Sequence, residues 1–367
     1  MKTIILGAGI TGLAAGIKTG ATIYEAKDVP GGICRSYHKN GYFFEVGGGH
    51  WIFGGDVDSM TFINSQCDLD EYTRKAGVYI NKIYPYPIQA ELSKDSVESR
   101  DSLKAWNHNN FSRELCNLFF DPFNEKYTAG LYDSIIQENE QKSPKSGKGY
   151  NDTFYYPTLG LDNLIDQIAS KCDIRFNKEV VRIDTGTKVV TFSDGKTVRY
   201  DRLISTLPLD RTLQMCELFE YLPYTSVKVL NIGAEKGKNC PDDHWLYIPH
   251  CKSGFYRVGF YSNVSNTFAP KGKVALYVEK AYVPDVDFDN PFYSKDVVEE
   301  LQNWGFIGTA DVVDENFIEY AYTWKFRNTR VENGLKHLKS KGIESIGRYG
   351  KWKFCGIVDS IKDGLSC

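Results

Sequence analysis

The chain has 367 residues, of which 42% are apolar and 25% are charged, a composition typical of a globular protein with a large core. Its formal net charge of −3 argues against nucleic-acid binding, because domains with that function usually carry a basic face. No apolar run is long enough to span a bilayer, and the first residues lead directly into a glycine-rich turn rather than forming a signal peptide. The nine cysteines are scattered singly and no His/Cys cluster has metal-ligand spacing, so we expect reduced thiols, no metal and a cytoplasmic location.

The first elements carry a dinucleotide-binding pattern. The apolar run 3–6 is expected to be a strand, and it leads into a G-A-G-I-T-G turn and a helical segment. Gly7 permits the tight turn, Gly9 lets the main chain approach a pyrophosphate, and Gly12 lets the helix pack close to the strand. The next strand ends at Glu25, whose carboxylate would accept hydrogen bonds from ribose hydroxyls, although the spacing is a few residues shorter than usual. The start of the helix would stabilise the phosphates.

A second signature follows Glu25. The pair Gly31-Gly32 and the basic Arg35 come after the acid and a short spacer. This order resembles the second signature of two-dinucleotide-binding-domain flavoproteins, in which the glycine backbone and the arginine approach the FAD phosphates. We therefore expect FAD rather than NAD, and a surface Pro-Gly-Gly turn is the simpler alternative.

Further along the chain, residues 57–150 are expected to be mostly helical, and the polar stretch 137–148 is expected to be a mobile surface loop. The segment 161–170 has a helical pattern. Asp194-Gly195 lies between two alternating runs, which is a strong signal of a β-hairpin. Strands dominate from about 220 to 325, and the last forty residues are expected to form a helix, a Gly-Arg turn and a helix.

These elements predict an α/β protein with a Rossmann-like FAD-binding domain that is discontinuous in sequence, made of residues 1–56, 157–215 and 335–367. Residues 57–156 would form a mainly helical substrate domain with a mobile loop near 137–150. Residues 216–334 would form a substrate domain built on an antiparallel sheet.

Six further motifs, in order along nearly the whole chain, resemble those of the UDP-galactopyranose mutase family, the flavin-dependent nucleotide-sugar pyranose/furanose mutases. The chain is similar to a divergent member of that family. The motifs are the Gly48-Gly49-His50 segment, Tyr84–Gln89, Pro122–Tyr127, Asn151–Pro157, Phe255–Arg257 and Gly347–Phe354.

The resemblance implies an isomerase that interconverts the pyranose and furanose forms of a UDP-galactose-like nucleotide sugar, with N5 of reduced FAD as the nucleophile at the anomeric carbon. His50, Arg257 and Arg348 would be its catalytic residues, and the arginines would hold the leaving diphosphate. A reductant such as NAD(P)H would be a partner, the product would serve polysaccharide biosynthesis, and a homodimer is one open assembly state.

The same resemblance assigns the binding residues. The cofactor would be held by Gly7, Gly9, Gly12, Glu25, Gly31, Gly32, Arg35, Gly48, Gly49, Val181, Gly347 and Arg348. The substrate would be held by Phe53, Gln89, Phe123, Asn124, Asn151, Tyr156, Arg257, Tyr322 and Phe354, with Phe123 stacking on the base.

The chain departs from the family pattern at three places. Phe354 stands where the family has a diphosphate-binding tyrosine, and Thr128 stands where it has a tryptophan near the sugar. No arginine occupies the mobile loop ahead of Asn151, where Lys145 and Lys148 are the candidates, and lysine cannot form the bidentate fork of arginine. These departures leave the identity of the sugar open.

Two other functions stay open. One is an FAD-dependent amine oxidase or protoporphyrinogen oxidase-like oxidoreductase, which would need a largely apolar tunnel. The other is a nucleotide-sugar-binding relative without catalytic activity. The candidate residues also have ordinary structural alternatives, since His50 could be a packed loop histidine, Arg257 a salt-bridge partner, and Tyr322 and Phe123 core rings.

Overall fold

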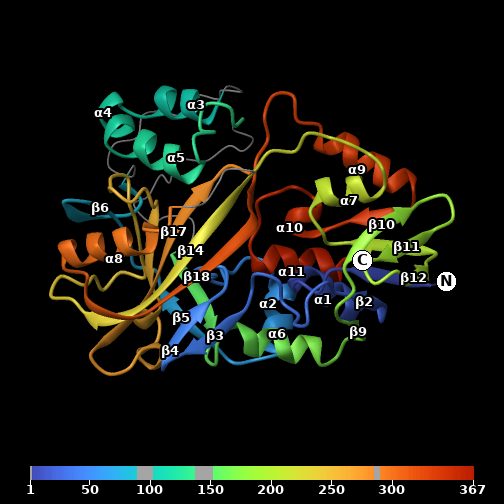
Figure 1. Cartoon of the computed structure of the whole chain (residues 1–367), viewed down its shortest axis with the longest axis horizontal. Coiled ribbons are helices and arrows are strands. Elements are labelled where there is room, and N and C mark those ends of the chain that lie inside the picture. The colour runs from blue at the N-terminus through green and yellow to red at the C-terminus, as the bar shows by residue number, and fades with distance from the viewer. Residues whose placement is uncertain (1, 89–101, 137–151, 285–289) are drawn as a thin grey trace.

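The computed structural model describes residues 2–88, 102–136, 152–284 and 290–367. It is a mixed α/β protein with a five-stranded parallel sheet and a seven-stranded mixed sheet, which lie in opposite halves of the molecule in Figure 1. The predicted fold class is confirmed. The predicted mobile loop near 137–150, Gln89 and Asn151 lie outside the described residues.

The parallel sheet forms around the first strand of the chain. In β1, Ile4, Ile5 and Leu6 have no exposed surface, as expected for a short apolar run with neighbours on both sides. The strand order is β19-β13-β1-β2-β9, and every pair is parallel. The bounds are β1 Thr3–Leu6, β2 Thr22–Tyr24, β9 Ile174–Arg175, β13 Arg202–Ser205 and β19 Ile343–Ser345.

Helices from distant parts of the sequence cover this sheet. In α6, four residues with helical spacing are completely buried, and they give the helix one apolar face. Helix α1 packs against both α6 and α11, so the first and last helices of the chain are neighbours (Figure 1). The bounds are α1 Ile10–Thr19, α2 Val57–Asn64, α6 Leu161–Ala169, α7 Leu209–Met215, α9 Val331–Ser340, α10 Gly347–Gly350 and α11 Ile357–Leu365.

Three small sheets accompany the parallel sheet. The hairpin predicted around Asp194-Gly195 is confirmed as β11 and β12, which pair antiparallel, and β10 completes a three-stranded sheet. The bounds are β3 Ser36–Lys39, β4 Tyr42–Glu45, β5 Leu69–Thr73, β8 Thr153–Pro157, β10 Val180–Asp184, β11 Val189–Phe192 and β12 Thr197–Arg199, with β3 paired to β4 and β5 to β8.

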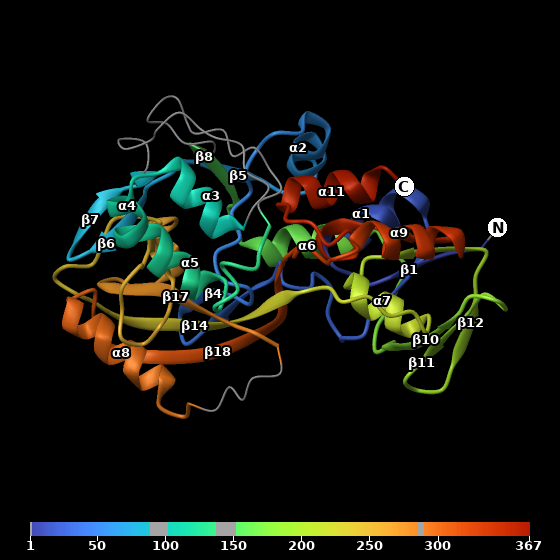
Figure 2. The same ribbon diagram turned by 90° about the horizontal axis from the view of Figure 1, so that it is seen from above.

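The large sheet has the order β18-β14-β17-β16-β15-β6-β7. Its pairs are antiparallel except β15 with β6, which is parallel. Figure 2 shows the long strands β14 and β18 running side by side. The bounds are β6 Ala76–Ile80, β7 Lys82–Pro85, β14 Tyr224–Lys236, β15 Trp245–Tyr247, β16 Arg257–Phe260, β17 Lys273–Tyr282 and β18 Ile307–Thr323.

Helices lie on both sides of the large sheet. Helix α8 packs on the sheet through Tyr293, Val297 and Leu301, which recur every four residues and are buried in one apolar cluster. A group of short helices lies on the side of the sheet opposite to α8 (Figure 2). The bounds are α3 Leu103–Asn110, α4 Arg113–Leu115, a π-helical turn at Cys116–Phe120, α5 Asp121–Tyr127, α8 Tyr293–Trp304, and 3-10 turns at Tyr261–Asn263 and Asn266–Phe268.

The segment 57–156 contributes to more than one part of the structure, and the division into three units stays a prediction. Strands β6 and β7 fall in the segment 57–156, which the sequence predicted to be mainly helical, yet they form one edge of the large sheet. Helix α2, in the same segment, packs against α11 of the nucleotide-binding half. Among the described residues no helix is long and apolar enough to cross a bilayer.

A buried histidine makes the free energy of unfolding depend on pH. His244 is 5% exposed and its Nδ1 accepts a hydrogen bond from the Lys75 main-chain N–H. Burial, with a smaller contribution from the Lys75 charge, lowers its pKa from 6.5 to about 4. Between these values the unfolded chain binds a proton that the folded chain does not, so stability is fully present above pH 6.5 and falls as pH decreases toward 4.

We expect this loss to reach about 3 kcal/mol across that window. The replacement His244→Asn keeps an acceptor for Lys75 but cannot titrate. The free energy of unfolding of this variant should therefore fall by about 3 kcal/mol less between pH 6.5 and 4 than that of the wild type. Urea unfolding of both proteins at several pH values measures the difference. Parallel curves for the two proteins would contradict the role of His244.

Candidate active site

The turn between β1 and α1 has the geometry that a pyrophosphate needs. Gly7 has φ of +93°, and a Cβ on Gly12 would lie 1.9 Å from the Gly7 carbonyl oxygen, so only glycine lets the helix approach this closely. A Cβ on Gly9 would meet nothing within 4 Å, so the main chain is open on that side. Gly9 caps α1 without a side-chain hydrogen bond, which leaves N–H groups at the helix start for an anion. The residues present therefore fit the phosphates of a dinucleotide.

The residues after β2 complete this site. Glu25 Oε2 accepts a hydrogen bond from the Ala8 N–H at 2.7 Å, and Oε1 accepts one from the Lys27 N–H at 2.9 Å. The carboxylate is thus fixed beside the glycine turn, with lone pairs left for a ribose. That Glu25 binds a ribose stays a prediction.

The second signature lies against the first. The Gly31 N–H donates to the Ala8 carbonyl oxygen at 2.7 Å, and a Cβ on Gly32 would lie 3.6 Å from the Gly9 Cα. Arg35, however, donates to Asp166 on α6 at 2.9 Å and to the Pro30 carbonyl oxygen at 3.3 Å. The structure therefore brings the glycines together but directs the Arg35 charge to a carboxylate.

The turn Gly47–Gly49 packs against β17. A Cβ on Gly48 would lie 2.5 Å from Glu279 Oε1, and one on Gly49 would lie 2.4 Å from the Tyr277 hydroxyl. Bulkier residues here would displace the turn from the sheet. The Tyr277 hydroxyl is buried, and no described residue forms a hydrogen bond with it. This leaves a polar group beside the predicted flavin-binding turn.

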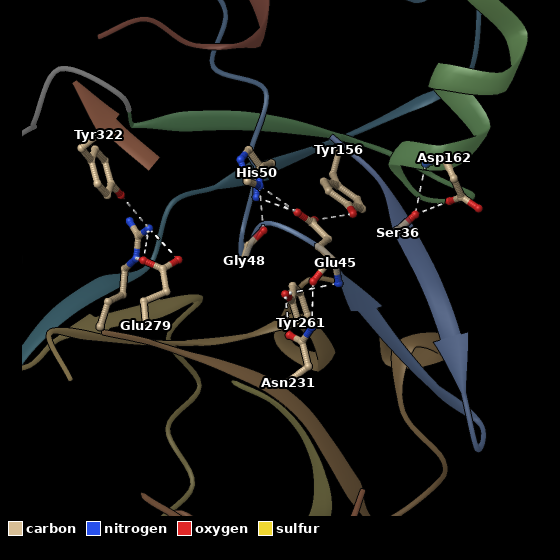
Figure 3. A network of polar contacts seen from close by, with 11 residues as sticks. Ser36, Glu45, Gly48, His50, Tyr156, Asp162, Asn231, Tyr261, Glu279 and Tyr322 are labelled. Carbon is tan, nitrogen blue, oxygen red and sulfur yellow. Dashed lines mark hydrogen bonds and ion pairs between the residues drawn. The ribbon is translucent and has the colours of Figure 1, made fainter. Parts of the chain in front are cut away.

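His50 is held by a buried carboxylate. Its main-chain N–H donates to Glu45 Oε2 at 2.9 Å, and its Nδ1 lies 2.8 Å from the Gly48 carbonyl oxygen and 3.3 Å from Glu45 Oε2 (Figure 3). A carbonyl can only accept, so Nδ1 carries the proton and Nε2 is an acceptor in the neutral ring. Sequence reasoning missed Glu45 as the residue that orients His50.

Tyr156, predicted to bind substrate, lies in the core beside Glu45. It is 1% exposed, and its hydroxyl donates to Glu45 Oε1 at 2.6 Å (Figure 3). Burial and the charge of Glu45 hold its pKa well above the ordinary value, so it stays a donor. In this structure Tyr156 is a core ring whose hydroxyl holds Glu45, and its role in substrate binding stays a prediction.

Arg257 forms a bidentate pair with Glu279. Its Nε lies 2.9 Å from Oε2 and its Nη2 lies 2.7 Å from Oε1, and Tyr256 donates to the same carboxylate at 2.6 Å. Glu279 is 1% exposed. Burial opposes the charge of Arg257 but Glu279 outweighs it, so the pKa of Arg257 lies well above its ordinary value. Glu279 was not predicted, although an acid inside the apolar run of β17 is the sequence signal that could have indicated it.

Arg348 lies in the Gly-Arg turn of α10, against the start of α1. A Cβ on Gly347 would lie 2.7 Å from Thr11 Oγ1, so glycine permits this contact. The Arg348 guanidinium donates to the carbonyl oxygens of Cys355 at 3.0 Å and Ala321 at 2.9 Å, and its Nε is buried without a partner. Among the described residues Arg348 forms no ion pair with a carboxylate. Its charge is therefore available to an anion.

Aromatic rings connect the two arginines. The Tyr322 hydroxyl oxygen lies 3.4 Å from Arg257 Nη2 (Figure 3). The centroid of the Tyr322 ring lies 5.5 Å from the Arg348 guanidinium carbon. Phe354 stacks on Tyr322 with centroids 6.3 Å apart and is 66% exposed. Phe123, the predicted base-stacking ring, packs with Phe119 and Tyr127 on the short helices.

The remaining predicted residues lie in less suitable positions. Asn124 is 8% exposed, and its amide donates to the Phe120 carbonyl oxygen, so its side chain is already used. Thr128 is buried and bonds the Asn124 carbonyl oxygen. Phe53 packs against Phe154, and Val181 is half exposed on β10. No described group of three or more His, Cys, Asp or Glu side chains could hold a metal.

The family model of flavin-containing amine oxidoreductases matches residues 8–89 and 73–303. The chain belongs to this family. FAD is accordingly its cofactor, and the glycine turns of the family member meet the steric requirement described above. Membership makes it a flavin-dependent enzyme by class, and its reaction is a separate question.

Three similar proteins show how varied the fold's functions are. A crystal structure of reduced UDP-galactopyranose mutase aligns with a TM-score of 0.87 and 24% identity, covering 99% of this chain and 92% of that one. A protein assigned as a protoporphyrinogen oxidase from Exiguobacterium sp. 255-15 aligns with a TM-score of 0.76 and 15% identity, covering 100% and 97%. Coproporphyrinogen III oxidase of Staphylococcus aureus is 36% identical over 96 residues, 23% of this chain and 20% of that relative's length.

Proposed function

We propose that this flavoenzyme interconverts the pyranose and furanose forms of a nucleotide-diphosphate sugar. Such a ring contraction breaks and reforms the anomeric bond to the diphosphate without net redox change. Reduced FAD, when bound, would supply the nucleophile for the anomeric carbon. A reductant such as NAD(P)H would keep the enzyme active, and the protein's task is to hold the diphosphate and orient the sugar.

The single observation that carries the proposal is the pair of guanidinium groups that both contact Tyr322. Arg348 has no carboxylate partner among the described residues, and its Nε is buried without a hydrogen bond. A leaving diphosphate needs cationic donors of this kind at close range. Arg257 is pre-oriented by its fork with Glu279, and its Nη2 lies 3.4 Å from the Tyr322 hydroxyl.

The exposed ring of Phe354 is available for stacking with the base or the sugar. Phe354 stacks on Tyr322 at an interplanar angle of 14° and lies 4.6 Å from the Arg348 guanidinium carbon. A phenylalanine gives a stacking face but no hydroxyl, so it would hold a planar group rather than a phosphate. In this arrangement Phe354 takes the stacking role that the sequence assigned to Phe123.

His50 would act at the reacting centre. Its Nδ1 is engaged with the Gly48 carbonyl oxygen, so Nε2 is the nitrogen that can accept or return a proton of a sugar hydroxyl. Glu45 keeps the ring in this tautomer through its position behind the imidazole.

An assay on the purified holoenzyme tests the proposal. The enzyme is reduced with dithionite, incubated with a panel of UDP- and dTDP-sugars, and the products are separated by chromatography and identified by NMR. Interconversion by the reduced enzyme and none by the oxidised enzyme is the expected result. Absence of conversion by reduced enzyme that retains FAD and binds the nucleotide sugar would leave only a binding protein.

One observation favours the oxidoreductase alternative. Glu279 offsets the charge of Arg257, so the net positive charge for a diphosphate comes from Arg348. A single net positive charge would also suit a substrate that is less anionic than a diphosphate. Release of hydrogen peroxide from an amine panel by the oxidised enzyme, without mutase activity, would establish that alternative.

A further inference from the structure

A lysine and a cysteine that have no part in the proposed active site lie side by side. Lys126 on α5 has its Nζ 3.4 Å from Cys251 Sγ, in the loop between β15 and β16. The same Nζ donates to the Phe255 carbonyl oxygen at 2.8 Å and to the Ile248 carbonyl oxygen. These acceptors hold the amine beside the sulfur, so the pair is pre-oriented.

Burial shifts both groups toward their neutral forms. The nearby carboxylate of Glu300 accepts from the N–H groups of Lys252 and Ser253 at 2.8 and 2.9 Å and from the Ser253 hydroxyl at 2.7 Å, so it does not bond Lys126. Burial lowers the pKa of Lys126 and raises that of Cys251. A deprotonated amine has a lone pair and is a nucleophile, which an ammonium is not.

Cys251 is only partly buried. Cys251 lines a surface hollow of about 730 Å³ together with Tyr79, His250, Glu300 and Trp304. The Sγ–H donates to the Phe255 carbonyl oxygen at 3.0 Å. An oxidant in this hollow would meet the sulfur, and the amine of Lys126 is already within van der Waals contact of it.

We propose that Lys126 and Cys251 form a modification site at which peroxide creates a covalent N–S bond between the two side chains. Hydrogen peroxide first oxidises the Cys251 thiol to a sulfenic acid and releases one water. The Lys126 amine then attacks the sulfur, the N–S bond forms as the S–O bond breaks, and the leaving hydroxide takes a proton from nitrogen as a second water. Two electrons pass from the pair to one peroxide, and two hydrogen atoms are lost from the protein.

The bond would link two elements that lie next to residues of the proposed active site. Tyr127 of helix α5 packs against Tyr322 with ring centroids 4.7 Å apart, and the loop of Cys251 leads into β16, which begins at Arg257. The cross-link would fix their relative positions. The chemistry itself does not depend on the proposed mutase activity, so its test stands apart from that of the activity.

Mass spectrometry of tryptic peptides after peroxide treatment of the protein tests the site. The holoenzyme is treated with hydrogen peroxide at mildly alkaline pH, because burial raises the pKa of Cys251, and is then digested with trypsin. We expect the peptides containing Lys126 and Cys251 to be joined, with a mass two hydrogen atoms below their sum and no cleavage after Lys126. Dithiothreitol should restore both peptides.

Three variants sharpen the result. Cys251→Ser and Lys126→Arg should each lose the joined peptide completely. Cys240→Ser is the matched control, because Cys240 occupies the same tryptic peptide and is partly buried. Its sulfur bonds the Pro241 carbonyl oxygen and no described amine, so the change should leave the cross-link unchanged.

Two results on the wild-type protein would contradict the proposal without any variant. Oxidation of Cys251 to sulfinic or sulfonic acid with normal cleavage after Lys126 would show that the amine does not react. A joined peptide with an additional oxygen atom would show that the two side chains are not connected by a direct N–S bond.

Discussion

Replacing Arg257 with alanine is expected to lower the free energy of unfolding by about 3–5 kcal/mol, because it leaves a buried carboxylate without its partner. Glu279 is 1% exposed and loses both contacts of the fork, retaining only the Tyr256 hydroxyl. The same change should weaken nucleotide-diphosphate binding by about 2 kcal/mol or more, as expected for the loss of hydrogen bonds to a charged group. Urea unfolding of the apoprotein and calorimetric titration with UDP measure the two effects.

A double variant separates stability from binding. In Arg257→Ala/Glu279→Gln the uncompensated charge is gone and an amide oxygen can still accept from Tyr256, so stability should recover while UDP affinity should not. Arg211→Ala is the control for a general charge effect, because Arg211 pairs with Glu319 at the surface, where both side chains are about half exposed. Unchanged UDP affinity in Arg257→Ala would remove Arg257 from the substrate site.

Replacing Gly9 with alanine should reduce FAD affinity at least about tenfold, or about 1.4 kcal/mol, without destabilising the apoprotein. The new Cβ would meet no atom of the protein within 4 Å, and Gly9 has a φ of −67° that alanine adopts freely. The methyl group would instead occupy the space through which a pyrophosphate approaches the turn. Fluorescence titration of the apoprotein with FAD and thermal unfolding without FAD report the two quantities.

Gly12→Ala is the informative companion. Its Cβ would lie 1.9 Å from the Gly7 carbonyl oxygen whether or not FAD is bound, so the apoprotein itself should lose about 1–3 kcal/mol of stability. A Gly9→Ala protein that binds FAD as tightly as the wild type would show that the phosphates do not approach the chain at this residue.

Local patterns were sufficient to predict the nucleotide-binding half. The strand, the glycine turn and the helix from residue 3 to 19 are contiguous, and each glycine's role follows from its neighbours within a few residues. The Asp194-Gly195 hairpin could be predicted for the same reason. Fold class and cofactor therefore followed from short-range chemistry, and both are confirmed.

The partners of the site residues could not be predicted in this way, because they come from distant segments. Nothing near Arg257 in the sequence indicates that Glu279 on the neighbouring strand neutralises it, and nothing near His50 indicates that Tyr156 holds the carboxylate behind it. A motif shows which residue types are present, but burial decides whether a tyrosine faces a ligand or the core. The roles of the substrate-binding residues accordingly remain predictions.

The order of strands in the parallel sheet has a consequence for biosynthesis. The first strand made, β1, needs β13 on one side, and β13 in turn needs β19, whose residues are among the last 25 of the chain. Helix α1 likewise lacks its packing partner α11 until the end of the chain has been made. At a translation rate of roughly 5–20 residues per second, the ribosome works for tens of seconds before this half can close. The edge of β1 that pairs with β13 and the side of α1 that packs on α11 therefore stay uncovered in the nascent chain until those elements emerge, and we expect chaperones to bind there.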